Sequence, residues 1–341
     1  SDPDVLSIKI TIYRLASKAK LAEYLCAAAE NGKEVTALME LRARFDEQNN
    51  IQWAERMEEA GCTILYGAEN IKVHSKVCLI TRRDKGKIQY ITQVGTGNYN
   101  EKTAKQYTDL CLMTARPEIG EDAAALFRNM ATANMEGNYK QLLVSPYQLR
   151  DKCMEHIDRE IAKGRDGYIF LKLNSITDRK LIDKLAQASQ AGVEVVMNVR
   201  GICCLLPGIA GLTDRITVFS IVGRYLEHAR IYVFGKGDQV KYFIASADLM
   251  TRNLQRRVEI ACPVESREVQ DFLSDYLARL LGDNVKARRM LPDGGFVRAE
   301  QAGAVPVSVQ QFYLDHPPQM RATERGKGRG WRLPELFRKR K

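Results

Sequence analysis

The sequence runs through the same succession of segments twice. Its first half alternates the strand-like runs LSIKITIY, EVTALMEL, CTILYG, VHSKVCLITRR and KIQYITQVGTGN with helix-like segments at residues 18–30 and 50–60. The second half repeats this order with GYIFLKLN, VEVVMNVRG, RITVFSIV, EHARIYVF and KYFIASADL, and with a helix-like segment at residues 177–191. NGKEV and AGVEV align at an offset of 160 residues, and the segments around His74 and His228 align at 154. Self-similarity of this kind predicts two copies of one folding unit.

The alternation of apolar strands and amphipathic helices predicts an α/β fold with two tandem domains, each a mixed, mostly parallel sheet flanked by helices. We expect the first domain at residues 1–143, the second at 144–305, and a basic, irregular tail at 306–341. Residues 117–159 have helical spacing with breaks near Gly137 and Pro146, and residues 265–281 indicate a closing helix. Two such copies can face each other about a pseudo-twofold axis, so that equivalent loops converge on one cleft.

Composition excludes several classes of protein. A chain of 341 residues with 45% hydrophobic content can bury a sizeable core, and no apolar run approaches the roughly 20 residues that span a bilayer. The eight cysteines form no C-x-x-C pair and several lie in apolar runs, which indicates buried thiols in a reducing compartment rather than disulfides or a zinc site. We therefore expect a cytoplasmic protein.

The formal charge of +10 is concentrated at the end of the chain. Residues 321–341 carry nine Lys/Arg and two Asp/Glu, so the rest of the chain is close to balanced. This tail is either an arm that contacts a polyanion or a solubilising segment without a partner. At the other end, Ser1 is followed almost at once by a strand-like run, and we expect a fragment of a longer protein with an upstream region missing.

Two of the four histidines occupy matching positions in the two repeats. Each is followed two residues later by a cation, in His74-Ser-Lys76 and His228-Ala-Arg230. Residues i and i+2 of a strand share a face, so each repeat should present an imidazole beside a positive charge. The cation favours the neutral, nucleophilic imidazole and attracts phosphate. The other two histidines, His156 and His316, are expected at the surface.

Each histidine segment leads to a strand that ends in small polar residues. In the first repeat this end is Gly95-Thr-Gly-Asn98, and in the second it is Ser246-Ala-Asp248 followed by Asn253. Glycine-rich turns expose backbone N–H groups that can hold phosphate oxygens, although a tight turn alone would also explain the first pattern. Paired H-x-K with G-x-x-N resembles the phospholipase D superfamily, in which one histidine attacks phosphorus and the other protonates the leaving group. That family has an Asp seven residues after each histidine, where this chain has Thr81 and Gly235.

A denser set of motifs resembles the bacterial polyphosphate kinase family. The matching segments are IKITIYRLA, ENGKEVTALMELRARFDEQNNIQWA, KVHSKVCLI, VGTGNYNEKTAKQYTDL and ADLMTRNLQRRVE, and the likeness runs from about residue 3 to about residue 300. The resemblance implies a duplicated phospholipase D-like fold and reversible transfer of the terminal phosphate of ATP, with Mg²⁺, to inorganic polyphosphate. It also implies that the family's N-terminal and middle regions are absent, so that the fragment can fold without full activity.

The resemblance further assigns roles to individual residues. His74 would be the phosphorylated nucleophile, and His228 would bind the nucleotide phosphates or move a proton. Arg14 and Arg44 match positions associated with magnesium, and because arginine is a poor metal ligand we expect them to hold phosphate oxygens of the metal–nucleotide complex. The residues expected around ATP/ADP are Tyr107, Arg200, Arg257, Lys76, Arg230 and Asn98, with Asp109 as a charge partner for one of the cations.

The partners implied are ATP/ADP and polyphosphate rather than a specific nucleic acid, and a homodimer or higher oligomer of the full-length protein in the cytoplasm or at the inner membrane. Two other functions stay open. A phospholipase D-like phosphodiesterase or nuclease would need no ATP, and the missing Asp and the RARFDE motif argue against it. A non-catalytic polyanion-binding module would show salt-dependent binding that survives loss of both histidines.

Overall fold

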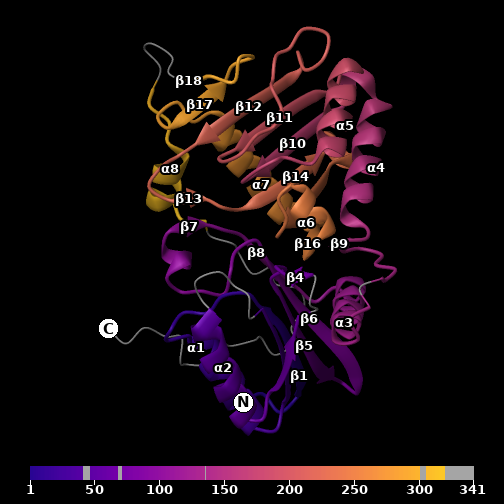
Figure 1. Cartoon of the computed structure of the whole chain (residues 1–341), viewed down its shortest axis with the longest axis vertical. Coiled ribbons are helices and arrows are strands. Elements are labelled where there is room, and N and C mark those ends of the chain that lie inside the picture. The colour runs from indigo at the N-terminus through magenta and orange to yellow at the C-terminus, as the bar shows by residue number, and fades with distance from the viewer. Residues whose placement is uncertain (41–46, 68–70, 135, 300–304, 319–341) are drawn as a thin grey trace.

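The computed structural model describes residues 1–40, 47–67, 71–134, 136–299 and 305–318 (Figure 1). Its strands are β1 (Val5–Ile12), β2 (Glu34–Met39), β3 (Thr63–Tyr66), β4 (Lys72–Val73), β5 (Val77–Asp84), β6 (Lys87–Gly95), β7 (Tyr107–Thr108), β8 (Cys111–Thr114), β9 (Leu143–Ser145), β10 (Tyr168–Leu173), β11 (Glu194–Val199), β12 (Ile216–Ile221), β13 (Leu226–Glu227), β14 (Arg230–Phe234), β15 (Lys241–Ala245), β16 (Arg257–Val264), β17 (Ala287–Met290) and β18 (Phe296–Arg298). Its α-helices are α1 (Lys20–Glu30), α2 (Glu47–Glu59), α3 (Pro117–Ala131), α4 (Leu149–Ile161), α5 (Arg179–Gln190), α6 (Thr251–Gln255), α7 (Arg267–Leu281) and α8 (Val309–Asp315).

The two repeats form sheets with the same strand order. In the first unit the order is β3-β2-β1-β5-β6-β8, and in the second the corresponding path is β12-β11-β10-β14-β15-β16. The predicted α/β duplication is therefore confirmed. The sheets are mixed, but they are less parallel than expected. Helical crossovers make β1, β2 and β3 parallel, whereas short hairpins join β5 to β6 and β14 to β15 and so make these pairs antiparallel.

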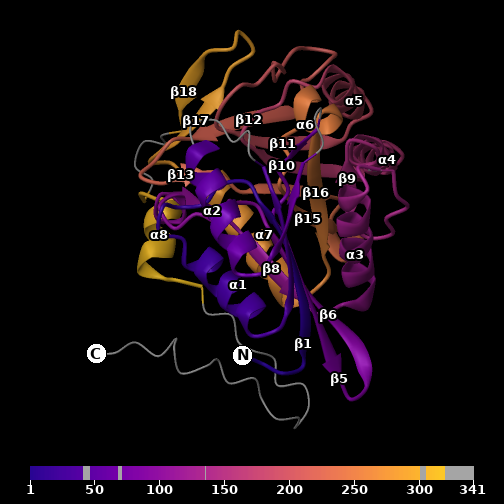
Figure 2. The ribbon, with the colours of Figure 1, turned by 60° about the horizontal axis from the view of Figure 1, so that its bottom comes forward.

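Helices cover both faces of each sheet (Figures 1 and 2). In the first unit α1 and α2 bury Leu25 and Trp53 against the β1–β2 side, while α3 packs against β5 and β6. In the second unit α4 and α5 share a core with β10 and β11, and α7 lies on the other face. The helix α5 begins at Asp178, whose side chain accepts a hydrogen bond from the Leu181 N–H, and ends before Gly192, which has a φ of +99°.

Two short strands cross from one unit to the other. The strand β4 of the first repeat lies parallel to β16 at the end of the second sheet, and β7 pairs with β13. Buried side chains from both repeats also form one continuous cluster, which includes Val77 and Leu126 from the first and Ile231 and Ile260 from the second. The units are therefore joined by backbone hydrogen bonds, immediately before each of the two repeated histidines.

These crossings correct the predicted strands. The run VHSKVCLITRR was expected to be one strand, but His74–Lys76 belong to no strand, because β4 pairs in the second sheet and β5 in the first. The histidine of the second repeat likewise falls between β13 and β14. Residues 117–159 hold not only helices but also β9, which pairs with β16.

Two smaller expectations also change. His156 was expected at the surface, but it is half-buried because α4 packs its ring on Phe234 at 4.9 Å, whereas His316 is exposed as predicted. Four of the cysteines are buried, but Cys111 on the edge strand β8 and Cys204 in a loop are exposed. Among the described residues, no helix combines the length and apolar character needed to cross a membrane.

Candidate active site

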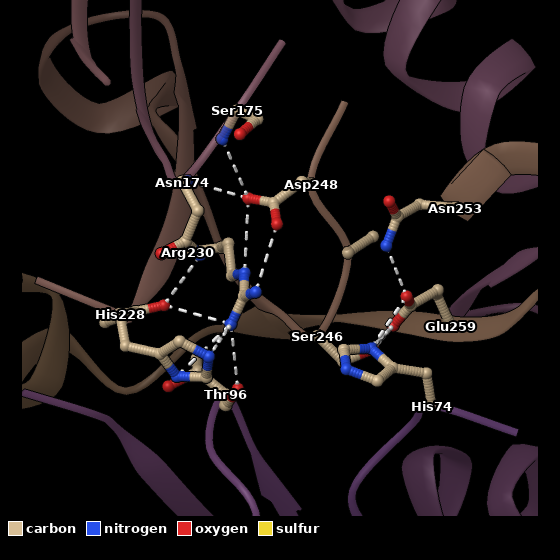
Figure 3. Close-up of polar contacts among 12 residues, drawn as sticks. His74, Thr96, Asn174, Ser175, His228, Arg230, Ser246, Asp248, Asn253 and Glu259 are labelled. Carbon is tan, nitrogen blue, oxygen red and sulfur yellow. Dashed lines mark hydrogen bonds and ion pairs between the residues drawn. The ribbon is translucent and has the colours of Figure 1, made fainter. Parts of the chain in front are cut away.

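His74 is held where the chain passes from β4 to β5. Its backbone N–H and that of Ser75 donate to the Val258 carbonyl at 3.0 and 2.9 Å. Its ring Nδ1 lies 2.8 and 3.0 Å from the two carboxylate oxygens of Glu259 in β16. A carboxylate only accepts hydrogen bonds, so Nδ1 carries the proton and Nε2 presents its lone pair. Ser246 and Asn253 donate to the same carboxylate and fix its orientation (Figure 3).

His228 is held in the equivalent way between β13 and β14. Its backbone N–H and that of Ala229 donate to the Thr108 carbonyl at 3.2 and 2.9 Å. Its Nδ1 lies 2.8 and 3.0 Å from the carboxylate oxygens of Asp109. Thr96 donates to Asp109 at 2.7 Å, as Ser246 does to Glu259. Asp109 was expected to balance a cation; it bonds the His228 imidazole, and its charge also stabilises the nearby Arg230 cation.

The two carboxylates are exchanged between the repeats. Glu259 of the second unit bonds the histidine of the first, and Asp109 of the first unit bonds the histidine of the second. Figure 3 shows both imidazoles in one polar cluster, with Arg230 beside His228 and the Glu259 carboxylate beside His74. Each half therefore supplies a histidine and orients the histidine of the other half.

Burial keeps both imidazoles neutral at neutral pH. Desolvation lowers the pKa of His74 to about 3, and the nearby Lys76 adds to the effect of burial against the attraction of Glu259. Burial also lowers the pKa of His228, with Arg230 acting in the same direction and Asp109 against it. For the two carboxyl groups burial alone would raise the pKa, but the histidines and neighbouring donors outweigh it and both values are lowered.

The Nε2 atoms of the two histidines differ. Nη1 of Arg230 lies 3.1 Å from Nε2 and 3.4 Å from Nδ1 of His228, so the guanidinium lies against the imidazole ring. Within the part of the chain that the structure describes, no hydrogen bond engages Nε2 of His74. The first histidine thus has a lone pair free for chemistry, whereas the second contacts a cation.

Lys76 and Arg230 are buried cations of the site. Lys76 donates to the carbonyl of His74, although His74–Lys76 is not extended strand, and its charge acts on the His74 ring. Burial lowers the pKa of Lys76 to about 7. Arg230 pairs with Asp248 at 3.0 Å and donates to the Thr96 carbonyl at 3.2 Å, so it bridges the two polar strand ends (Figure 3).

Several of the other predicted residues lie beside the histidines or their hydrogen-bond partners. The Tyr107 ring lies 5.0 Å from the His228 ring, and Arg200 donates to Asn174, which in turn donates to the His228 carbonyl. Nη1 of Arg257 lies 4.0 Å from Glu259. Of the three remaining positions, Asn98 lines a cavity of about 460 Å³ with Tyr107 and Asp109, the Arg14 guanidinium lies 5.6 Å from the Tyr13 ring, and Arg44 falls outside the described residues.

Comparison with known proteins assigns the chain to a family. Residues 1–136 match the family model of polyphosphate kinase C-terminal domain 1, and residues 142–310 match that of polyphosphate kinase C-terminal domain 2. The chain belongs to the polyphosphate kinase family. It is 46% identical over 298 residues to a polyphosphate kinase of Bacillus cereus, covering 86% of this chain and 42% of that protein, and 45% identical over 304 residues to one of Thermosynechococcus vestitus, covering 88% and 42%. The chain therefore spans less than half the length of these curated relatives.

Solved structures agree with the family and the fold. The crystal structure of polyphosphate kinase from Porphyromonas gingivalis superposes with a TM-score of 0.84 at 38% identity, over 92% of this chain and 49% of that one. The phosphatidylserine synthase of Haemophilus influenzae gives a TM-score of 0.58 at 10% identity, over 92% and 88%, which shows a shared fold alone. The matches to two consecutive domain models and the shared phospholipase D-like fold both agree with the expected duplication of one folding unit.

Sequence reasoning missed several residues of this candidate site. Glu259 had no predicted role. An alignment of QYTDL in the first repeat with RRVEI in the second would have placed it at the position equivalent to Asp109. Tyr13, whose ring lies 4.9 Å from the His74 ring, ends the predicted strand LSIKITIY and belongs to the matched segment IKITIYRLA, but it was given no role. Asn174 occupies the equivalent place in the second repeat. The pairing of residues across the repeats carries no local signal in the sequence.

Proposed function

We propose that this chain transfers the terminal phosphate of ATP reversibly to inorganic polyphosphate, through a phosphohistidine formed on His74. The observation that carries the proposal is the neutral imidazole of His74, whose Nδ1 is bonded to Glu259 and whose Nε2 keeps its lone pair. Membership of the polyphosphate kinase family supports the donor and the acceptor.

The first half-reaction forms one bond and breaks one. Nε2 of His74 attacks the γ-phosphorus, the bond from phosphorus to the bridging oxygen breaks, and ADP leaves with that electron pair on its β-phosphate. The ring then carries a positive charge, which the Glu259 carboxylate stabilises through Nδ1–H. In the second half-reaction a terminal oxygen of polyphosphate attacks the phosphorus and the N–P bond breaks, restoring neutral His74.

In this scheme His228 positions phosphate rather than transferring a proton. The leaving and attacking groups are phosphate oxygens, which need no proton to leave or to attack near neutral pH. Phosphoryl transfer depends chiefly on alignment and on neutralising charge. Arg230, Arg200, Arg257 and Arg14 would supply these donors. His228 would donate to a phosphate oxygen only with Nε2 protonated, because its Nδ1–H bonds Asp109.

Magnesium would enter as part of the nucleotide substrate. Among the described residues, no group of three or more His, Cys, Asp or Glu side chains could hold a metal ion. The arginines proposed for this part of the site are donors only. These residues therefore do not fit a resident Mg²⁺ site, and we assign no step to a metal held by the protein.

Labelling with γ-³²P ATP and Mg²⁺ tests the proposal. The unaltered protein should acquire an acid-labile, base-stable label that polyphosphate removes. The label should be lost in His74→Ala and retained in His316→Ala, a matched control at an exposed histidine. Label that persists in His74→Ala would exclude this nucleophile, and cleavage of a phosphodiester without ATP would favour the phosphodiesterase alternative. We further propose a cytoplasmic, self-associating full-length protein, which fractionation and sedimentation would test.

A further inference from the structure

The residues that precede the two histidines differ in charge. Val73 precedes His74, whereas Glu227 precedes His228. The Glu227 carboxylate lies 3.1 Å from Nζ of Lys172, and the exposed fractions of the two side chains are 1% and 0%. Both charges of so deeply buried an ion pair lose their hydration, and this desolvation free energy offsets much of the stability that the pair would add to the fold.

Lys172 contacts both neighbours of His228. Its Nζ bonds the Glu227 carboxylate and lies 3.2 Å from the Ala229 carbonyl. The structurally equivalent residue of the first unit, Thr11, donates to the Ser75 carbonyl at 2.8 Å. In both units a side chain therefore donates to the backbone carbonyl of the residue after the histidine, Ser75 or Ala229, but only in the second unit does a buried ion pair do so. The first unit folds with a neutral threonine and a valine at these places, so the fold itself does not require the charges.

The Glu227 carboxylate also gathers donors from other elements. Thr108 in β7 donates at 3.0 Å, Tyr276 in α7 at 2.9 Å, and Gln310 in α8 at 2.7 Å. Thr108 is the residue whose carbonyl accepts the His228 N–H, and the next residue, Asp109, bonds the ring. The position of Glu227 and the position of the imidazole are thus tied to the same short strand.

Gln310 bonds the backbone of Tyr225, the residue just before β13, as a neighbouring strand would. Its Nε2 donates to the Tyr225 carbonyl at 2.8 Å, and its Oε1 accepts from the Tyr225 N–H at 3.0 Å. A Cβ atom on Gly223 would lie 2.5 Å from this Oε1, so the glycine leaves room for the amide. The strand β13 is consequently held on one side by β7 and on the other by a single side chain of α8.

We propose that Gln310 and the buried Lys172–Glu227 pair are positioning residues that set the place of the His228 ring relative to Asp109. They touch no phosphate in the proposed reaction and act through β13 and the Ala229 carbonyl. Their effect on turnover rests on the proposed function, but their effect on the His228 ring does not.

The test uses the ¹⁵N-histidine NMR spectrum, in which four histidines give four assignable side chains. In Gln310→Ala the His228 ring resonances should shift while those of His74 stay in place. Gln311→Ala, an exposed neighbour on the same helix, should leave all four unchanged. A double variant, Lys172→Thr with Glu227→Val, copies the first unit, leaves no buried charge unpaired, and should shift the same His228 resonances.

Turnover provides the second measurement. A displaced His228 should lower kcat about ten- to a hundredfold, with little change in KM for ATP, in both Gln310→Ala and the double variant. If both variants are folded and keep the His228 resonances and kcat of the unaltered protein, the proposal is wrong. Absence of turnover in the full-length protein would overturn the proposed function alone, because the resonances report ring position without any substrate.

Discussion

Nδ1 of His74 lies 2.8 Å from a carboxylate oxygen of Glu259, although 185 positions of sequence separate the two residues. The bond fixes the tautomer that exposes Nε2, and it places a negative charge where a phosphorylated ring becomes positive. Glu259 therefore sets both the tautomer and the electrostatic environment of the His74 ring.

Glu259→Gln should therefore slow phosphorylation of His74 by about 10²- to 10⁴-fold, as expected when an orienting carboxylate becomes an amide. The amide can donate as well as accept, so it no longer enforces the Nδ1–H tautomer. Single-turnover labelling with γ-³²P ATP would measure the rate. Glu268→Gln on the exposed side of α7 is the control and should label normally. An unchanged rate in Glu259→Gln would remove this carboxylate from the mechanism.

Gly97→Ala should disturb the second dyad. A Cβ atom at this position would lie 2.1 Å from a carboxylate oxygen of Asp109, so the carboxylate must move away from His228. We expect kcat to fall by about tenfold or more. Gly282→Ala, where the added methyl group meets only ordinary contacts, should behave as the unaltered protein. Equal kcat values in the two variants would contradict the role given to Asp109.

The buried neutral histidine should make stability depend on pH. Burial lowers the pKa of His74 to about 3, whereas in the unfolded chain a histidine titrates near 6.5. Between these values the unfolded state binds a proton that the folded state does not, so the free energy of unfolding falls as pH drops below about 6.5. In His74→Asn the slope between pH 4 and 6 should be shallower by up to about 1.4 kcal/mol per pH unit. Urea unfolding at several pH values measures this, and identical slopes would contradict it.

Asp248→Asn should destabilise the protein. Asp248 is the partner of the buried Arg230 at 3.0 Å and also accepts from the Asn174 backbone N–H at 2.7 Å. Removing its charge leaves the guanidinium without its ion-pair partner, which costs about 3–5 kcal/mol in the free energy of unfolding. Asp183→Asn removes an exposed ion pair and should change it by less than about 1 kcal/mol. Similar urea midpoints for the two variants would show that Arg230 is satisfied by other groups.

Hydrophobic patterning predicted much of this fold because each repeat carries its own strand and helix periods. The same patterning placed His74 and His228 at equivalent points. It failed at His74–Lys76, where the predicted strand is broken because β4, which begins at Lys72, forms backbone hydrogen bonds with β16 of the other unit. It could not pair Glu259 with His74 or Asp109 with His228, since both contacts depend on how two separately patterned units dock. The contacts of Gln310 with Tyr225 and Glu227 could not be predicted for the same reason, since α8 lies far along the chain from both residues.

The seam between the units has a mechanical consequence. The strand β4 pairs with β16 beside His74, and β7 pairs with β13 beside His228. A hinge motion that separated the two units would therefore break the backbone hydrogen bonds next to both histidines. A substrate that reacts at His74 in the proposed way would have to enter and leave while the two units stay joined.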